Sequence, residues 1–534
     1  MSEKVEVEKD IVDHIESIPG NNAGVSSNEN STWEELWQNR RVLFWCLLIF
    51  LLPVNFGYEN AMIGNLFASS AFQLRFGVEV NGNWTVAARD QQILNAAPTI
   101  GLFAAALATG FLSDFLGRKK VVIMACVICI GGVILQYFSD TVMMLFGGKL
   151  VACFGFGLGH SLGPVWVAEL APNSIRGICL ALINTMIVIG QWLSSLCIYA
   201  ASFREGDSAW RIPLITQIIM PGLLFLIGVP FLPESPTWLL MRGRDEEAHK
   251  ALKRFNGPKF DADSAMQTMR NALEMEKSTT EAQSSASYLD CFRGPNLRRT
   301  TIICMVYLAQ QFLGVNFVSG YLTYYFDLAG VGNALAVAQG AYAIQLFGNM
   351  CSWPLIERVG RRSLLVYGSI IMTFGLLVIG CINIKITDAA LKATVALMCL
   401  WGWLYQGSLG AVAYAVGGET PTPRLRQKTY AINIMSATAV SCMVNQVIPY
   451  LINPDKANLG GKIGFIFFGP SVLVCIYLFF CVPEMQGRTP EELEEMFTVE
   501  VPARKFQTYL KTHPALVGDH RRYRNQEAES ESKY

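Results

Sequence analysis

Two residues of opposite charge stand inside long apolar stretches of this sequence, Glu59 in the run 42–65 and Lys149 in the run 142–168. An ionised side chain in the hydrocarbon core of a membrane costs several kcal/mol, so a charged residue there is a candidate functional residue. Burial favours the neutral form of a carboxyl group, while a nearby cation favours the ionised form. The chemistry that these two residue types suggest is the reversible binding of a proton.

The two charges lie at nearly the same depth, measured from the outer ends of their helices. Glu59 lies about 6 residues, or about 9 Å, from the outer end of its helix. Lys149 lies about 7 residues, or about 10 Å, from the outer end of its own helix. A buried charge is best tolerated beside its opposite, so we expect the two to pair. We hypothesise that Glu59 takes up a proton from outside and releases Lys149. The alternatives are a permanent structural ion pair and a Glu59 that faces external water.

The elements that must position this pair are membrane helices. Of the 534 residues, 52% are hydrophobic and 16% are charged, whereas soluble proteins have about 25% charged residues. The apolar residues come in blocks of about 20, long enough to cross about 30 Å of hydrocarbon. We predict twelve spans: 42–65, 93–112, 121–138, 142–168, 178–200, 212–232, 301–326, 334–356, 364–384, 393–416, 430–452 and 463–482.

The spans divide the chain into five parts. These are an N-terminal tail 1–41, a six-helix half 42–232, a linker 233–299, a second six-helix half 300–483 and a C-terminal tail 484–534. Basic residues are more frequent in the loops on the side of the two tails, which predicts that both termini are cytoplasmic. The sequon at Asn83 then lies outside, as a predicted N-glycosylation site. The start of the chain lacks the pattern of a signal peptide, so we expect the first span to direct insertion.

Outside the spans, local pattern is less informative. The linker segments 245–247 and 273–276 contain five acidic residues, Asp245, Glu246, Glu247, Glu274 and Glu276, and lie in helical patterns. The charged segment after Phe497 predicts a disordered tail. The cysteines lie mostly inside apolar runs, where the thiol packs as a small hydrophobic group, so we expect neither disulfides nor a metal site.

The two halves repeat each other. Gly117-Arg118 and Gly360-Arg361 follow the second and eighth spans, 243 positions apart. Glu169 and Glu419 follow the fourth and tenth spans, and Pro233 and Pro483 follow the sixth and twelfth, each pair 250 positions apart. Such a repeat is typical of transporters that hold their substrate near the midplane between two pseudo-symmetric halves.

The loops also carry a family resemblance. The motifs are GFLSDFLGRK at 110–119, PVWVAELAPNSIRG at 164–177, PESPTWLL at 233–240, QQFLGVN at 310–316 and PEMQGRT at 483–489. Together they resemble the signatures of the sugar porter family of the major facilitator superfamily, in family order. The segments 287–292, 298–300, 424–429 and 501–506 are similar to fungal α-glucoside (maltose-type) permeases. The resemblance implies an all-α membrane protein, with twelve transmembrane helices in two pseudo-symmetric six-helix halves and a cytoplasmic helical linker.

The resemblance also implies roles for the charged pair. In proton-coupled sugar porters an Asp of the first span pairs with an Arg of the fourth, and these positions match Glu59 and Lys149. Both residue types differ here from the family pattern.

Uncharged amides are the second set of candidate site residues. Sugar hydroxyl groups both donate and accept hydrogen bonds, and so do Asn and Gln amides. The resemblance selects as substrate-binding residues Asn184, Gln310, Gln311, Asn316, Gln345 and Tyr414. The alternative for the amides is that they join helices, at about 0.6 kcal/mol per hydrogen bond. For Tyr414 the alternative is packing or interfacial anchoring.

Charged residues at the cytoplasmic ends of the spans form a third set. We predict a gating latch that joins the halves in the outward-open state and parts in the inward-open state. Its candidates are Asp114, Arg118, Glu169, Arg176, Glu234, Glu357, Arg361, Glu419 and Arg426. The alternative is that the basic residues only enforce topology. Thr237 stands where the family has Arg, so one polar partner is missing.

These observations predict a transporter of the plasma membrane and not an enzyme. We expect proton-coupled uptake of a neutral sugar, most simply an α-glucoside or related oligosaccharide of the maltose, sucrose or raffinose type. The alternatives are a hexose symporter or facilitator, and a sugar receptor that signals without transport. The expected partners are a small neutral sugar, a proton and the lipid bilayer. The net charge of +0 argues against nucleic acid, and we expect no cofactor.

Overall fold

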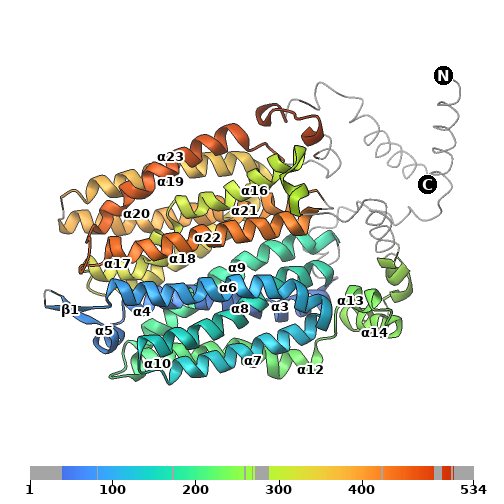
Figure 1. Cartoon of the computed structure of the whole chain (residues 1–534), viewed down its shortest axis with the longest axis horizontal. Coiled ribbons are helices and arrows are strands. Elements are labelled where there is room, and N and C mark those ends of the chain that lie inside the picture. Colours follow the sequence, from blue (N-terminus) through green and yellow to red (C-terminus); the bar gives the residue numbers. More distant parts are fainter. Residues whose placement is uncertain are drawn as a thin grey trace.

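The protein is a bundle of long helices that run roughly side by side (Figure 1). The computed structural model describes residues 39–80, 82–170, 173–257, 260–267, 269–270, 288–385, 387–422, 425–485, 493, 496–506 and 509. One end of the bundle carries the antiparallel hairpin of β1 (Val78–Val80) and β2 (Asn83–Thr85). The other end carries α13 (Pro236–Met241) and α14 (Asp245–Asn256). We refer to them as the hairpin end and the linker end.

The first half contains the helices up to residue 231. They are α3 (Arg40–Ile49), α4 (Leu51–Phe67), α5 (Ser70–Phe76), α6 (Ala88–Leu116), α7 (Arg118–Tyr137), α8 (Val142–Leu170), α9 (Asn173–Ala201), α10 (Ser208–Ile215), η1 (Thr216–Ile218), α11 (Ile219–Leu223), η2 (Leu224–Gly228) and α12 (Val229–Phe231). The segment from α10 to α12 is one predicted span, interrupted by a turn of 3-10 helix at η1 and a turn of π-helix at η2.

The second half follows the same plan after a short 3-10 helix, η3 (Tyr288–Phe292). Its elements are α16 (Gly294–Phe312), η4 (Asn316–Gly320), α17 (Leu322–Leu328), α18 (Ala334–Val359), α19 (Arg361–Ile382), α20 (Asp388–Gly407), α21 (Leu409–Glu419), α22 (Arg426–Ile452), η6 (Gly460–Lys462) and α23 (Ile463–Cys481). The helices α7 and α19 each start directly after a glycine with positive φ, Gly117 at 91° and Gly360 at 92°. Glycine adopts this conformation at little cost, so the repeat extends to the backbone of these turns.

Ten predicted spans coincide with helices that, within the described residues, are long and apolar enough to cross a membrane. The two remaining predicted spans, 301–326 and 334–356, are helical as well, as α16, η4 and α17 and as α18. Both pack inside the bundle, α16 against α22 and α23 and α18 against α20 and α9. They are more polar than the others because they carry several of the candidate amides, among them Gln310 and Gln345.

The halves contact each other through symmetry-related helices. Within the first half α4 packs against α9 and α6 against α8, and within the second half α16 packs against α22 and α18 against α20. Between the halves α9 packs against α18 and α22 packs against α6. These two contacts exchange under the repeat, as two pseudo-symmetric halves require.

The ends of the bundle are covered by shorter elements. The hairpin pairs Val80 with Asn83, and the Asn83 side chain is exposed, as an acceptor of a glycan must be. At the linker end α14 confirms the helical pattern at 245–247, whereas 273–276 lies outside the described residues.

The prediction of disorder directly after Phe497 is wrong for residues 498–506. This segment ends in a turn of 3-10 helix, η7 (Ala503–Lys505), and Phe497 and Phe506 are fully buried. Burial of these aromatic rings outweighs the charged composition of the segment.

Candidate functional site

Glu59 on α4 and Lys149 on α8 form an ion pair in the interior of the first half. Lys149 Nζ donates a hydrogen bond to Glu59 Oε1, and the two side chains are 1% and 4% exposed. Cys153, one helical turn after Lys149, places its Sγ 3.2 Å from the same oxygen. Glu59 Oε2 is buried and has no hydrogen-bond partner in the part of the chain that the structure describes. One carboxylate oxygen is therefore satisfied, and the other is available to a proton.

Close helix packing holds Glu59 in this position. A Cβ atom on Gly57 would lie 2.0 Å from the carbonyl oxygen of Ile187, and one on Gly190 would lie 2.0 Å from that of Val54. Only glycine lets α4 and α9 approach so closely. With α9 against one side of α4, the Glu59 side chain reaches α8 in the interior of the half.

Three of the candidate amides lie where the seventh predicted span is broken. The helix α16 ends at Phe312, Gly314 has a φ of 84°, and η4 is a turn of π-helix that begins at Asn316. Asn316 Nδ2 donates to Gln311 Oε1 at 2.9 Å and to Ser441 Oγ of α22 at 3.2 Å. Turns of π-helix are frequent at functional sites, and broken helices surround the substrate in many transporters.

Several of these amides have buried atoms without a partner among the described residues. They are Nδ2 of Asn184, Nε2 of Gln310 and both amide atoms of Gln345. Beside Asn184, Thr185 donates across the halves to Asn349 Oδ1 at 2.7 Å. A buried polar group left unsatisfied costs about 1–3 kcal/mol, so such atoms call for a water or a ligand.

Two further candidates, Gln345 and Tyr414, have contacts within the second half. Gln345 is fully buried and packs against Gly402 of α20, within its own half. Tyr414 on α21 is 41% exposed, and its ring meets that of Tyr307 edge to face at 5.9 Å. The structure brings Gln311 and Asn316 into contact.

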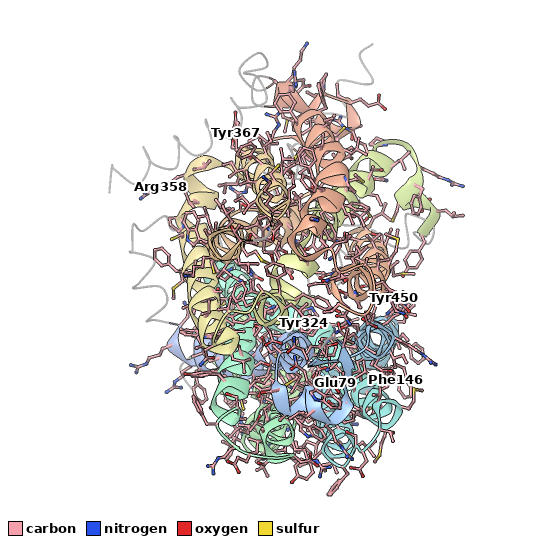
Figure 2. All side chains as sticks on the ribbon, turned by 90° about the vertical axis from the view of Figure 1, so that its left-hand side faces the viewer. Glu79, Phe146, Tyr324, Arg358, Tyr367 and Tyr450 are labelled. Atoms are coloured by element: carbon pink, nitrogen blue, oxygen red, sulfur yellow. The ribbon has the colours of Figure 1, made fainter. Side chains whose placement is uncertain are left out.

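Hydrogen bonds between the halves gather at the hairpin end. Figure 2 looks onto this end and labels Tyr324 and Tyr450 at the boundary between the halves. Gln73 donates to Asp327 at 2.8 Å, and Asn95 donates to the Tyr321 hydroxyl. These hydrogen bonds join the halves at the end of the bundle toward which α4 runs, and the Glu59–Lys149 pair lies buried behind them.

Asn453, at the end of α22, is the centre of this closure. It is fully buried, and its Oδ1 accepts from Gln91 at 2.9 Å and from Tyr324 at 2.7 Å. Its Nδ2 donates to the carbonyl oxygen of Val86 at 2.8 Å. Beside it, the Asp455 carboxylate accepts from the amide of Ala88, the first residue of α6, at 3.3 Å.

Of the predicted latch, the structure describes Arg118, Glu234 and Arg361. Glu234 Oε1 accepts from the backbone amides of Arg118 at 2.9 Å and Lys119 at 3.2 Å, within the first half. Glu484 occupies the matching place in the second half and accepts from the amides of Arg361 and Arg362, both at 3.0 Å. Each carboxylate thus binds the N-terminus of α7 or α19, where the helix dipole favours an anion. Six latch side chains lie outside the described residues: Asp114, Glu169, Arg176, Glu357, Glu419 and Arg426.

Sequence reasoning missed Cys153 and Asn453. Cys153 stands four residues after Lys149, so its helical spacing from a candidate site residue was a usable signal. Asn453 precedes Pro454 in a connection between two spans and reads as a turn residue. Its contacts depend on the far half of the molecule, and no local pattern predicts them.

The chain matches the profile of the family described as "Sugar (and other) transporter" over residues 45–497. It belongs to this family. The transporter is 27% identical over 507 residues to a general alpha-glucoside permease of Saccharomyces cerevisiae, covering 93% of this chain and 82% of the permease. It is also 27% identical over 475 residues to the maltose permease MAL31 of the same yeast, covering 87% and 77%.

Solved structures establish the fold. The transporter matches the proton:xylose symporter XylE bound to 6-bromo-6-deoxy-D-glucose with a TM-score of 0.67 and 23% identity, covering 86% of this chain and 99% of XylE. An inward-open form of XylE from E. coli matches with a TM-score of 0.68 and 22% identity, covering 85% and 99%. The predicted major facilitator fold is confirmed, and the matched relatives are sugar transporters and permeases rather than enzymes.

Proposed function

We propose that the transporter moves an α-glucoside or related oligosaccharide into the cell together with a proton. The observation that carries the proposal is the buried Glu59–Lys149 pair, in which one carboxylate oxygen has no partner among the described residues. Protonation of Glu59 would neutralise its carboxylate and so remove the attraction that holds Lys149. The proposed orientation has the hairpin end outside and both termini in the cytoplasm of the cell, with the protein in the plasma membrane.

The helix α4 offers a route by which the proton acts on the boundary between the halves. Six residues beyond Glu59, Asn65 accepts from Thr323 at 2.5 Å and donates to Tyr342 at 3.5 Å, both in the second half. A change of the pair at Glu59 that shifts α4 therefore alters contacts that close the hairpin end. In the proposed cycle the proton and sugar enter from outside, the hairpin end closes, and both leave at the linker end.

The sugar site is proposed between the halves. Gln310, Gln311 and Asn316 at the break of the seventh span would face Asn184 on α9, with Gln345 and Tyr414 as further members. The unpartnered amide atoms of Asn184, Gln310 and Gln345 support hydrogen bonding to a polyol. The relatives named for α-glucosides and maltose favour that substrate class over a hexose.

The proton gradient supplies enough free energy for accumulation. One proton that enters a cell whose interior is at −100 mV releases about 2.3 kcal/mol. Each unit of pH difference adds about 1.4 kcal/mol. With two pH units the sum is about 5 kcal/mol, which corresponds to a sugar ratio above about 10³ at equilibrium.

Uptake of labelled sugars by transporter-null cells tests the proposal. We expect a protonophore and Glu59→Gln each to abolish the accumulation of maltose. The exchange of labelled for unlabelled maltose across the membrane should remain. The matched control is Glu79→Gln, because Glu79 lies exposed in β1 and should leave both measurements unchanged. Uphill accumulation by Glu59→Gln with unchanged pH dependence contradicts the proposal.

The same assay separates the alternatives. Uptake of glucose without maltose, sucrose or raffinose indicates a hexose transporter. Maltose uptake that is insensitive to the protonophore indicates a facilitator. A correctly placed protein that transports none of these sugars indicates a receptor.

A further inference from the structure

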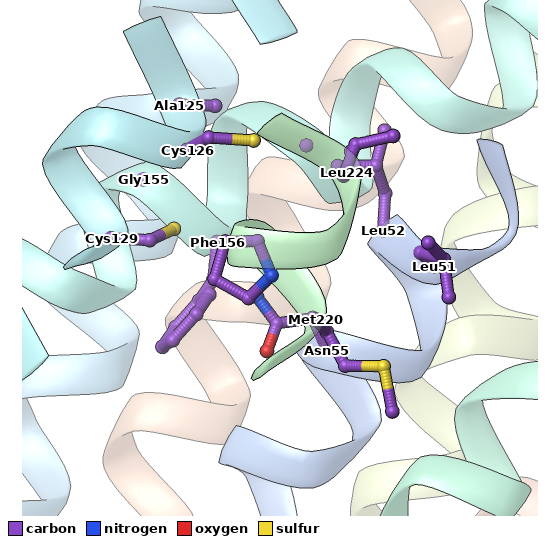
Figure 3. Close-up of a pocket in the computed structure, with 12 residues that line it drawn as sticks. Leu51, Leu52, Asn55, Ala125, Cys126, Cys129, Gly155, Phe156, Met220 and Leu224 are labelled. Atoms are coloured by element: carbon purple, nitrogen blue, oxygen red, sulfur yellow. The ribbon is translucent and has the colours of Figure 1, made fainter. Parts of the chain in front are cut away.

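A small cavity lies inside the first half, on the linker side of Glu59 (Figure 3). It lies between α4, α7, α8, α11 and η2, and its lining includes Leu51, Asn55, Cys129, Phe156 and Met220. Its free space is about the size of one water molecule. The cavity is separate from the boundary between the halves, so it does not belong to the proposed sugar site.

Among the described residues that line the cavity, Asn55 is the one with an amide side chain. Its side chain is 5% exposed, and its Oδ1 is buried without a hydrogen-bond partner within the described residues. Figure 3 shows the Asn55 amide among the side chains that enclose the cavity. Burying an unsatisfied amide destabilises a protein, and an apolar residue would fill this place better. The amide oxygen therefore calls for a donor, and a water in the cavity can supply one.

The position of Asn55 relates it to the proton site. Asn55 stands four residues before Glu59 on α4, on the same face and about 6 Å along the axis. Since α4 runs from the linker end to the hairpin end, Asn55 lies on the linker side of the carboxyl group. Asn55 is thus the first polar side chain on this face of α4 on the linker side of Glu59.

The polar side chains that contact Glu59 are engaged with one of its two carboxylate oxygens. Lys149 and Cys153 both contact Glu59 Oε1. Cys129 reaches the carbonyl oxygen of Ala152 with its Sγ, at 3.9 Å. Glu59 Oε2 and Asn55 Oδ1, two buried atoms without a hydrogen-bond partner in the described part of the chain, belong to residues one helical turn apart on α4.

We infer that Asn55 is a positioning residue for proton release, holding a water that accepts the proton from Glu59. This inference rests on the proposed proton coupling. In the step, the O–H bond of the protonated carboxyl group breaks and a new O–H bond forms on the water. The resulting hydronium ion passes its excess proton to the next water toward the linker end. The carboxylate that remains pairs again with Lys149, and no electrons are transferred.

The test compares Asn55→Leu with Asn55→Ser in the uptake assay. Leucine has a similar volume but no acceptor, so it should slow net proton-coupled uptake by about tenfold, the effect of one lost hydrogen bond. The exchange of labelled for unlabelled sugar across the membrane needs no proton release. Its rate should stay within about twofold of wild type. Serine restores a hydroxyl group and leaves room for water, so Asn55→Ser should keep most of the net uptake. Met220→Leu, a volume-conserving change in the same cavity, is the control and should leave both rates unchanged.

The outcomes distinguish this inference from the proposed function. An equal fall of exchange and net uptake in both Asn55 variants means that the residue only supports the fold, which overturns the inference. Unchanged net uptake in Asn55→Leu overturns it too. If Glu59→Gln remains proton-coupled, the proposed function itself fails. If Glu59→Gln is uncoupled while Asn55→Leu is normal, only the role of Asn55 fails.

Discussion

At the scale of single residues, the charged pair that we propose as the proton site belongs to one half alone. Glu59 and Lys149 both lie in the first half, and Cys153 in the same half shares the contact. A buried ion pair adds little net stability compared with apolar residues, because desolvation offsets the attraction. The pair is therefore better explained by the proposed binding and release of a proton at Glu59 than by the stability of the fold.

This reasoning gives a prediction for Lys149. Lys149→Leu leaves Glu59 buried without its cation, which should destabilise the protein by about 3–5 kcal/mol. The double variant Glu59→Leu with Lys149→Leu replaces the pair by apolar groups and should recover most of the lost stability. Thermal unfolding of the purified protein in one lipid-detergent mixture measures both.

The double variant should still be unable to accumulate sugar. A double variant that is no more stable than Lys149→Leu would contradict this account, because the cost would then come from packing rather than charge. Lys149→Arg keeps the cation and serves as the control.

At the scale of elements, the sequence predicted what depends on local chemistry. Span positions follow from apolar runs, and the pairing of Glu59 with Lys149 follows from the fixed rise of a helix. The π-turn at Asn316–Gly320 and the bonds of Asn453 do not follow, because they depend on helices that are distant in the chain. Most of the fold was therefore predictable, and most of the contacts between the halves were not.

The closure at the hairpin end gives a prediction with a matched control. Asn453→Leu removes three hydrogen bonds, two of which cross to the first half at Gln91 and Val86. Asn383→Leu also removes three, but its partners Tyr325, Thr394 and Ile379 all lie in the second half. At about 1 kcal/mol per bond, Asn453→Leu should raise the population that is open at the hairpin end by about tenfold or more.

Hydrogen exchange of the amides at the start of α6 measures this population. Exchange there should accelerate in Asn453→Leu and stay near wild type in Asn383→Leu, although both variants lose stability. Equal acceleration in the two variants would mean that the closure does not depend on Asn453.

At the scale of the whole molecule, each half carries its own cover at the linker end. On the first half α14 packs against α3, and the ring of Phe255 meets that of Trp45 at 5.8 Å. On the second half Arg298 of α16 donates to the carbonyl oxygen of Val501 at 2.7 Å and lies over the rings of Phe497 and Phe506. A shift of 250 positions, the separation of Pro233 and Pro483, moves 245–256 onto 495–506. The repeat thus predicts an ordered segment around Phe497, whereas charge composition alone predicts disorder there.

If the segment around Phe497 is a structural cover, its loss should weaken the second half without uncoupling transport. Phe497 is fully buried and Arg299 lies 4.6 Å from its ring centroid, so Phe497→Ala should cost about 3–5 kcal/mol of stability. Phe374 on α19 is 64% exposed, and Phe374→Ala should leave the unfolding temperature nearly unchanged. Maltose exchange and net uptake should fall together in Phe497→Ala, in proportion to folded protein. A selective loss of net uptake would instead make the segment part of the coupling mechanism.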